Sequence, residues 1–235
     1  MKIAVIGAGV AGLTAGRVLA ESGHEIVVFE KSGGYGGRLA TRYAGNKNAT
    51  KVDHGLPYLE VSSSKIEPLI NELVEIGILK PWKGPFIHLN EDGEQTQVKL
   101  TKKRYIAPNG INQVGKRLAR MVDVRTETKV SGVTHIGEDR TKKRSWMLNF
   151  PTGIAENFDA VIIATPSKQA YAILNTTIDE IQTLKLVSKI DSVEYESTFS
   201  LMVGYGSAEI PEWAMMNCDN HVIDFITNEA SKREG

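Results

Sequence analysis

The chain has 235 residues, of which 41% are hydrophobic and 24% are charged, so it holds enough apolar sequence for a buried core. Its 28 basic residues balance its 28 acidic residues, which argues against a nucleic-acid-binding protein, because such proteins carry a basic excess. The single cysteine, Cys218, excludes an intrachain disulfide and a cysteine-built zinc site, and it favours a reducing, cytoplasmic location.

The first apolar run, residues 1–16, has a superficial likeness to a signal peptide. Several glycines lie within it, and Arg17 ends it directly. The run is also shorter than the roughly 18 residues that indicate a membrane span. We therefore expect no targeting segment and no membrane partner.

The start of the chain predicts a parallel βαβ unit. Residues 2–6 and 25–30 are short β-branched runs, typical of strands that are buried on both faces. Residues 11–22 between them have helical periodicity and end at Gly23. A strand, a helix and a second strand within about 30 residues match the size of such a unit.

The remaining chain alternates between helical and strand-like patterns, which predicts an α/β fold. We expect further helices at residues 64–76, 110–121, 167–174 and 178–187. We expect further strands at residues 86–89, 95–100, 123–134, 145–150, 158–164, 199–205 and 222–227. Residues 31–45 are glycine-rich and indicate a loop.

A glycine motif lies between the first strand and the first helix. Gly7, Gly9 and Gly12 have the GxGxxG spacing of a dinucleotide-binding turn. The first glycine permits the turn, the second lets the backbone approach a pyrophosphate, and the third lets helix and strand pack closely. The free amides at the start of the helix then face the anion. The predicted cofactor-binding residues of this turn are Gly7, Ala8, Gly9, Val10, Ala11 and Gly12.

An acidic residue ends the second strand. Glu30 lies close to the offset of about 20 residues at which such folds carry an acceptor for the ribose hydroxyls. We add its neighbour Lys31 to the predicted site. An ordinary glycine-rich turn in an unrelated domain is the alternative, and the joint presence of strand, helix and acid argues against it.

A second glycine-rich segment, residues 32–42, favours FAD over NAD as the predicted cofactor. Its turn can pack against the same pyrophosphate and place Arg38 near the negative charge, whereas a simple dehydrogenase has no use for such a turn. Arg42 either supports the flavin loop or forms a surface ion pair. The predicted cofactor-binding residues of this segment are Gly36, Gly37, Arg38, Leu39 and Arg42.

These motifs together resemble the flavin-containing amine oxidase superfamily, whose members carry a Gly-Gly-Arg segment after the first dinucleotide motif. Residues 52–58, 105–110, 158–166, 195–205 and 223–232 are similar to segments of its renalase-like branch. The resemblance implies an FAD-dependent oxidoreductase that oxidises dihydronicotinamides, especially misreduced isomers of NAD(P)H. It implies hydride transfer to the flavin, with molecular oxygen as the acceptor.

The resemblance also implies further site residues. It places His54 and Tyr58 nearest the flavin, and Gly55, Val130 and Ala164 around the cofactor, with the Val130 backbone at the adenine. His54 as a turn residue and Tyr58 as a core tyrosine are the alternatives. The five histidines show no metal-ligand spacing, so we expect no metal.

The implied architecture is a Rossmann-like FAD-binding domain with a three-layer parallel sheet, interleaved with an α+β substrate domain. We assign residues 1–57 and 105–168 to the first domain, and residues 58–104 and 169–235 to the second. Leu56 and Pro57 depart from the alanine and glutamine that are usual in the branch. Renalase-like proteins also continue into a Gly-Asp segment that holds the flavin, so we expect the C-terminal part of the substrate domain to be missing.

Three other functions stay open. An FAD-dependent amine oxidase would use the same flavin face. A non-catalytic flavin- or nucleotide-binding fragment agrees with the expected missing segment. An NAD(P)-dependent dehydrogenase would bind no flavin. The sequence carries no signal for the oligomeric state.

Overall fold

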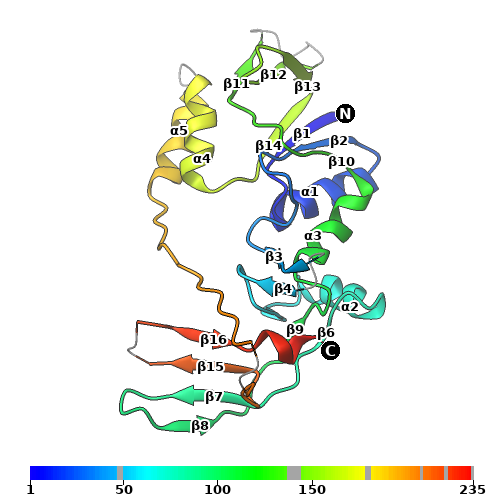
Figure 1. The fold of residues 1–235 in the computed structure, drawn as a ribbon. Helices are drawn as coiled ribbons and strands as arrows, with labels where there is room; N and C mark the ends of the chain where they lie inside the picture. Colours follow the sequence, from blue (N-terminus) through cyan, green and yellow to red (C-terminus); the bar gives the residue numbers. More distant parts are fainter. Residues whose placement is uncertain (47–49, 137–143, 178–180, 207–208, 220–221, 234–235) are drawn as a thin grey trace. The chain divides into compact units, whose positions relative to one another are not determined.

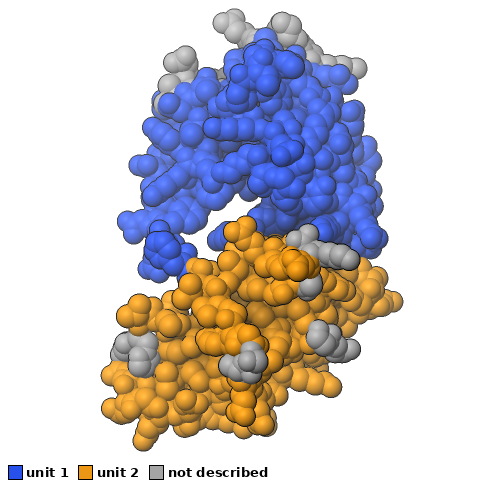
Figure 2. Space-filling model, viewed as in Figure 1, with its two compact units in different colours: residues 1–38, 115–199 blue, residues 39–114, 200–235 orange. Residues whose placement is uncertain are grey.

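The computed structural model describes residues 1–46, 50–136, 144–177, 181–206, 209–219 and 222–233. The chain forms two compact units, each built from two separate stretches (Figure 2). The first unit holds residues 1–38 and 115–199, and the second holds residues 39–114 and 200–235. The units therefore alternate along the sequence. The division into an FAD-binding and a substrate domain at the predicted boundaries stays a prediction.

A four-stranded parallel sheet organises the first unit (Figure 1). Its order is β10-β2-β1-β14, with the bounds β1 (Lys2–Ile6), β2 (Glu25–Phe29), β10 (Asp123–Arg125) and β14 (Ala160–Ile163). Helix α1 (Val10–Glu21) joins β1 to β2 and supplies the crossover that a parallel pair requires. The predicted βαβ unit is thus confirmed.

Both faces of this sheet are covered, which explains why the inner positions of its strands are apolar. Charged residues occupy only the strand ends, at Lys2, Glu25, Asp123 and Arg125. Ala4 and Ile6 of β1 belong to one core cluster, together with Phe29 and Phe158. Gly16 of α1 lies near β2, where an added Cβ would be 3.4 Å from the Ile26 side chain. Helix and strand therefore lie close enough that a Cβ at position 16 would be in van der Waals contact with β2.

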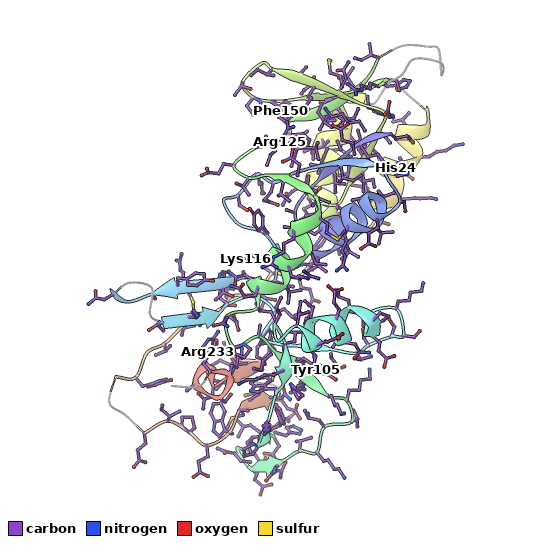
Figure 3. All side chains as sticks on the ribbon, turned by 90° about the vertical axis from the view of Figure 1, so that its right-hand side faces the viewer. His24, Tyr105, Lys116, Arg125, Phe150 and Arg233 are labelled. Carbon is purple, nitrogen blue, oxygen red and sulfur yellow. The ribbon has the colours of Figure 1, made fainter. Side chains whose placement is uncertain are left out.

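A three-stranded antiparallel sheet packs its side chains into the same core. It consists of β11 (Gly132–His135), β12 (Trp146–Asn149) and β13 (Ala155–Phe158). The Phe29 ring lies 5.3 Å from that of Phe150 and 5.4 Å from the Arg125 guanidinium, and Figure 3 labels these two neighbours. The aromatic side chains therefore link the two sheets.

Helical segments complete the first unit. They are α3 (Asn112–Leu118), η2 (Ala119–Met121), α4 (Ser167–Leu174), η3 (Asn175–Thr177) and α5 (Ile181–Asp191). The boundary between the units falls inside α3. Within the described part of the chain, no helix is long and apolar enough to cross a membrane.

The second unit contains a mixed sheet with the order β16-β15-β7-β8. Its strands are β7 (Phe86–Leu89), β8 (Gln95–Gln97), β15 (Met215–Cys218) and β16 (Phe225–Thr227). β15 and β7 are parallel, and the outer pairs are antiparallel. Strands from two distant chain segments therefore share one sheet.

Smaller elements surround a second core in this unit. They are the hairpin of β3 (Thr41–Ala44) and β4 (Thr50–Asp53), the sheet of β5 (Leu59–Glu60), β9 (Arg104–Ile106) and β6 (Lys80–Pro81), and helix α2 (Glu67–Glu75). Trp82, Phe86 and Met215 form part of the core cluster. Ile70 and Leu73 of α2 are fully buried, as its amphipathic pattern predicts.

Three expectations about local structure need correction. Residues 199–205 form no strand, and Phe199 and Leu201 are 96% and 87% exposed because no neighbouring strand pairs with them. Residues 123–134 form two strands instead of one, with Glu127 between them at a φ of 53°. The loop expected at 31–45 contains strand β3, because β4 pairs with it. Residues 178–180 of the expected helix lie outside the described residues.

Candidate functional site

The first glycine turn connects β1 to α1 and has a different requirement at each glycine. Gly7 has a φ of 104°, a left-handed conformation that favours glycine. A Cβ at Gly12 would lie 2.0 Å from the Gly7 carbonyl oxygen, so no side chain fits there. Gly9 has an ordinary φ of −72°, and an added Cβ would meet nothing within 4 Å. Fold geometry therefore requires glycine at 7 and 12, while Gly9 faces open space.

The end of α1 at this turn is suited to an anion. Gly9 is the N-cap, and it makes no side-chain hydrogen bond to the helix. The first turn of α1 carries no acidic residue. The first amides of a helix lack partners within the helix, and its dipole favours negative charge at this end. Val10 and Ala11 are the first residues of α1, and Ala8 before them is fully buried.

The second glycine turn packs its backbone directly on the first. The Gly36 amide donates to the Ala8 carbonyl at 2.8 Å, and Gly9 and Gly36 form a parallel bridge. Gly36 and Gly37 have φ values of 100° and 58°, and a Cβ at Gly37 would lie 3.2 Å from the Gly9 Cα. Two backbone segments thus meet beside the open space at Gly9, and we call residues 7–12 with 36–37 the glycine cradle.

Gly115 is a part of this arrangement that the sequence analysis missed. A Cβ there would lie 2.7 Å from the Gly36 Cα. Helix α3 therefore supports the second turn by close backbone contact. An isolated glycine within a helical pattern was the only signal in the sequence.

Glu30 connects the two turns. Its Oε2 accepts the Ala8 amide at 2.9 Å, and its Oε1 accepts the Ser32 amide at 2.9 Å and the Ser32 hydroxyl at 2.7 Å. A carboxylate has about four acceptor positions, so one remains on Oε2. This position can accept a ribose hydroxyl, and the same side chain also fixes the cradle.

Two more predicted residues contribute to the floor and the core of the first unit. The Ala164 amide donates to the Ile6 carbonyl at 2.8 Å, and the Ala164 side chain lies 3.1 Å from the Cβ position of Gly12. Ala164 thus packs against the cradle at Gly12. Val130 is 6% exposed and belongs to the core cluster with Phe29. Lys31 and Arg38 are both exposed.

Tyr195 contacts the start of α4, a contact that the sequence analysis did not predict. Its hydroxyl accepts the Ser167 amide at 3.0 Å, at the start of α4. This hydrogen bond, the Ser167 side chain and the charge of Arg38 hold the pKa of Tyr195 below its usual value. Because 28 residues separate Tyr195 from Ser167, no local pattern could indicate the contact.

The other predicted residues, Leu39, Arg42, His54, Gly55 and Tyr58, belong to the second unit. The His54 and Gly55 amides donate to the Ala40 carbonyl at 3.1 and 3.4 Å, and the Ser200 hydroxyl donates to the His54 carbonyl at 2.8 Å. The backbone at His54 is therefore held on both sides, while the residue is exposed. Leu39 is 3% exposed, and Arg42 is exposed.

Tyr58 has core contacts. The Arg104 guanidinium lies 4.3 Å from the centre of its ring, and the Trp82 ring lies 5.9 Å away. A tyrosine between a cation and an aromatic ring stabilises the local packing. The ring therefore contributes to the packing of the second unit. A place for Tyr58 near the substrate stays a prediction.

Asp53, the residue directly before His54 in the sequence, belongs to a group of four charged side chains that we call the charge cluster. They are Asp53, Glu229, Lys232 and Arg233, with side-chain exposures of 0%, 19%, 0% and 15%. Burial raises the pKa of Glu229, but the charge and hydrogen bond of Lys232, the Asp53 amide and Arg233 outweigh it. The pKa of Glu229 therefore lies below its usual value.

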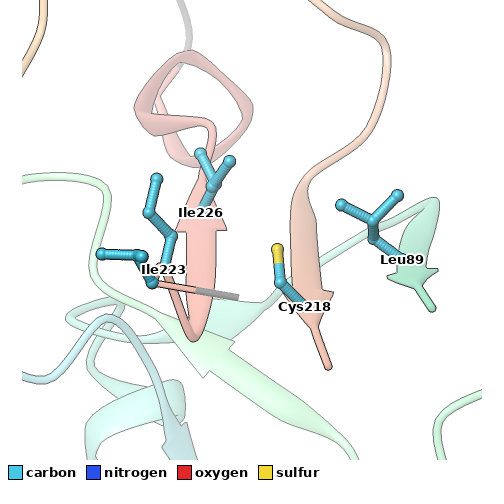
Figure 4. A pocket seen from close by; sticks show the side chains of 5 residues that line it. Leu89, Cys218, Ile223 and Ile226 are labelled. Atoms are coloured by element: carbon cyan, nitrogen blue, oxygen red, sulfur yellow. The ribbon is translucent and has the colours of Figure 1, made fainter. Parts of the chain in front are cut away.

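An apolar cavity of about 320 Å³ lies in the second unit (Figure 4). Its lining is Leu89, Cys218, Val222, Ile223 and Ile226. Burial and the charges of Asp219 and Asp224 raise the pKa of the Cys218 thiol, so it is a poor nucleophile. The cavity therefore offers apolar contact and no acid or base. Among the described residues, no three His, Cys, Asp or Glu side chains are grouped to hold a metal.

The parallel sheet and the glycine cradle define a dinucleotide-binding protein of the Rossmann-like class. Residues 5–73 match the family described as NAD(P)-binding Rossmann-like domain, and residues 85–212 match the family described as flavin containing amine oxidoreductase. The second match covers more than half of the chain, so the chain belongs to the flavin containing amine oxidoreductase family. It is an FAD-dependent oxidoreductase of the renalase-like kind.

Individual relatives agree with this membership. The chain is 26% identical to Mus musculus renalase over 244 residues, which is 99% of this chain and 67% of renalase. It is 59% identical to a Staphylococcus aureus 4,4'-diapophytoene desaturase over 39 residues, 17% of this chain and 8% of the desaturase. The chain thus spans about two thirds of the length of renalase and far less of the desaturase.

Solved structures share the fold. A Pyrococcus furiosus protein has a TM-score of 0.64 at 15% identity, over 98% of this chain and 75% of its own. A putrescine oxidase variant has a TM-score of 0.56 at 14% identity, over 73% of this chain and 59% of its own. At such identities the likeness concerns the fold alone, which is α/β as predicted.

Gly9→Val should abolish FAD binding without unfolding the chain. The Cβ at this position meets no protein atom, and the φ of −72° suits a β-branched residue, but the added methyls fill the space that a pyrophosphate needs. Flavin fluorescence titration and thermal unfolding check this. Gly12→Val is the control and should fail to fold, because its Cβ would overlap the Gly7 carbonyl. Wild-type FAD affinity in a folded Gly9→Val protein contradicts the prediction.

Glu30→Ala should weaken FAD binding by about 1–3 kcal/mol, as expected when hydroxyl and amide donors lose a charged acceptor. It should also lower the free energy of unfolding without FAD, because the Ala8 and Ser32 amides lose their partner. Isothermal titration with FAD and urea unfolding measure the two effects. Glu30→Gln retains an acceptor oxygen and should show smaller losses. Unchanged FAD affinity in Glu30→Ala excludes Glu30 as the ribose ligand.

Glu229 should make stability sensitive to acid. Its folded pKa lies below the usual value of 4.5, so its stabilisation is complete above pH 4.5 and is lost as the pH falls through the folded pKa. The free energy of unfolding should therefore fall more steeply with acid in wild type than in Glu229→Gln. Urea unfolding from about pH 7 down to about pH 3 compares the slopes. Equal slopes show that Glu229 does not titrate in this way.

Proposed function

We propose that this chain takes part in the oxidation of a dihydronicotinamide, with the misreduced isomers of NAD(P)H as the preferred donors. Similarity to renalase over 99% of the chain supports this substrate class. The observation that carries the proposal is the open space at Gly9, which two backbone turns border and no side chain fills. A pyrophosphate group requires such a space.

The first unit supplies the residues for FAD. The α1 amides and the backbone at Gly9 would bind the pyrophosphate, and Arg38 would add positive charge near it. Glu30 accepts a ribose hydroxyl at its remaining Oε2 position. The Val130 backbone would lie beside the adenine, as the resemblance to the family implies. Bound FAD would supply a hydride acceptor from which molecular oxygen could take up the electrons.

In the second unit, we propose that His54 and Gly55 border the flavin. The backbone of His54 is fixed by its bonds to Ala40 and Ser200, so the imidazole is presented from a rigid turn. Tyr58 keeps its proposed place near the substrate, with its ring held by Arg104 and Trp82. Both residues shape the face and exclude water. We also propose a cytoplasmic location, because the chain carries one cysteine.

Amine oxidation is the second candidate. The family match over residues 85–212 is to flavin containing amine oxidoreductases, which favours a C–N donor at the same flavin face. A non-catalytic flavin- or nucleotide-binding role is the third candidate, because the glycine cradle accounts for cofactor binding and not for a reaction.

Anaerobic flavin reduction tests the proposal. The purified chain is loaded with FAD and mixed in turn with a misreduced NADH isomer, with ordinary NADH and with a primary amine. Bleaching of the flavin band by the isomer supports the proposal, and bleaching by the amine alone supports amine oxidation. FAD uptake without bleaching by any donor supports the non-catalytic role. A nicotinamide difference spectrum without flavin uptake indicates a dehydrogenase.

A further inference from the structure

Each carboxylate oxygen of the charge cluster before His54 has a donor or a cation beside it. Asp53 Oδ1 accepts the Thr41 hydroxyl at 2.8 Å and the Ile111 amide at 3.0 Å. Asp53 Oδ2 meets Arg233 Nη2 at 3.1 Å and Lys232 Nζ at 3.6 Å. Asp53 therefore joins four chain segments that are distant in the sequence.

Glu229 completes the cluster from the other side. Its Oε1 accepts Lys232 Nζ at 2.6 Å and the Thr227 hydroxyl at 3.3 Å. Its Oε2 accepts Arg233 Nη1 at 2.6 Å and the Asp53 amide at 2.9 Å. The cluster holds two charges of each sign. Because its members share partners, movement of one removes a contact from another, which restrains the network. Among the described residues, the buried Arg233 Nε is the cluster atom that has no hydrogen-bond partner.

Lys232 is the centre of the cluster. Its side chain is fully buried, and its ammonium group reaches both carboxylates and lies 5.3 Å from the Trp82 ring. Arg233, labelled in Figure 3, follows it at the end of η4 (Glu229–Lys232). Two adjacent cations on one short turn thus fix the residue that directly precedes His54.

We propose that Lys232 is a positioning residue that acts through Asp53 on His54. The Asp53 amide and carboxylate are held by the charge cluster, and the next two amides are held by the Ala40 carbonyl. The backbone of His54 is thus restrained by hydrogen bonds, and its side chain is exposed. The functional meaning of this arrangement rests on the proposed role of His54 at the flavin.

A merely structural cluster would affect folding and nothing else. A positioning cluster predicts a change at the His54 ring and in the chemistry per bound flavin, at temperatures well below unfolding. FAD affinity should stay near wild type, because the glycine cradle belongs to the other unit. These readouts separate the two roles.

The experiment compares Lys232→Met with Lys102→Met. Lys102 pairs with Glu60 at 3.6 Å and is half exposed, so the same substitution there leaves the charge cluster intact. The double variant of Glu229→Gln with Lys232→Met removes one charge of each sign and serves if the single variant does not fold. The His54 ring signal, assigned by comparison with His54→Gln, is recorded by NMR for each protein without FAD. The rate of anaerobic flavin reduction is then measured at saturating donor.

We expect the His54 signal to shift or broaden in the Lys232 variants and to stay in place in Lys102→Met. We expect flavin reduction to slow by about tenfold or more in the Lys232 variants, since a small misplacement of a site residue has effects of that size. An unmoved His54 signal in folded Lys232 variants overturns the proposal. If wild type is reduced by no donor, the proposed function fails, and the His54 signal still decides whether Lys232 positions the turn.

Discussion

The contact between two backbone turns is the constraint on which this structure depends. Gly36 donates to Ala8, and Gly9 pairs with Gly36, so two loops meet without side chains between them. Any Cβ at Gly12 or Gly115 would collide with these turns, at 2.0 and 2.7 Å. Three elements hold the two turns in contact. They are the apolar parallel sheet, the crossover helix α1 and helix α3. The result is a group of backbone amides beside the open space at Gly9, and such amides can bind an anion.

Much of the first unit could be predicted from the sequence because its signals are local. The strand, the glycine turn, the helix and Glu30 lie within 30 residues, and each has a defined structural requirement. The structure adds that Glu30 also binds the Ala8 and Ser32 amides, a role that the ribose interpretation did not include. Glu30 is thus part of the cradle as well as a candidate ligand.

The second unit was less predictable, because its stability depends on long-range contacts. Asp53 was noticed only as part of a family segment, whereas its partners lie at positions 41, 111 and 233. The periodicity of the sequence cannot indicate the salt bridge between Asp53 and Arg233, because 180 residues separate them. The strand expected at residues 199–205 was wrong for the same reason, since a strand needs a neighbouring strand and the local sequence does not show whether one is present.

The surroundings of Cys218 have a consequence for the durability of the protein. Oxidants attack the thiolate, and partial burial beside two carboxylates keeps this sulfur in its protonated form. Any peroxide that accumulates around a flavoenzyme should therefore react slowly with its single cysteine. Formation of a sulfenic acid, and dimerisation through a disulfide that would follow from it, are disfavoured by the same local electrostatics.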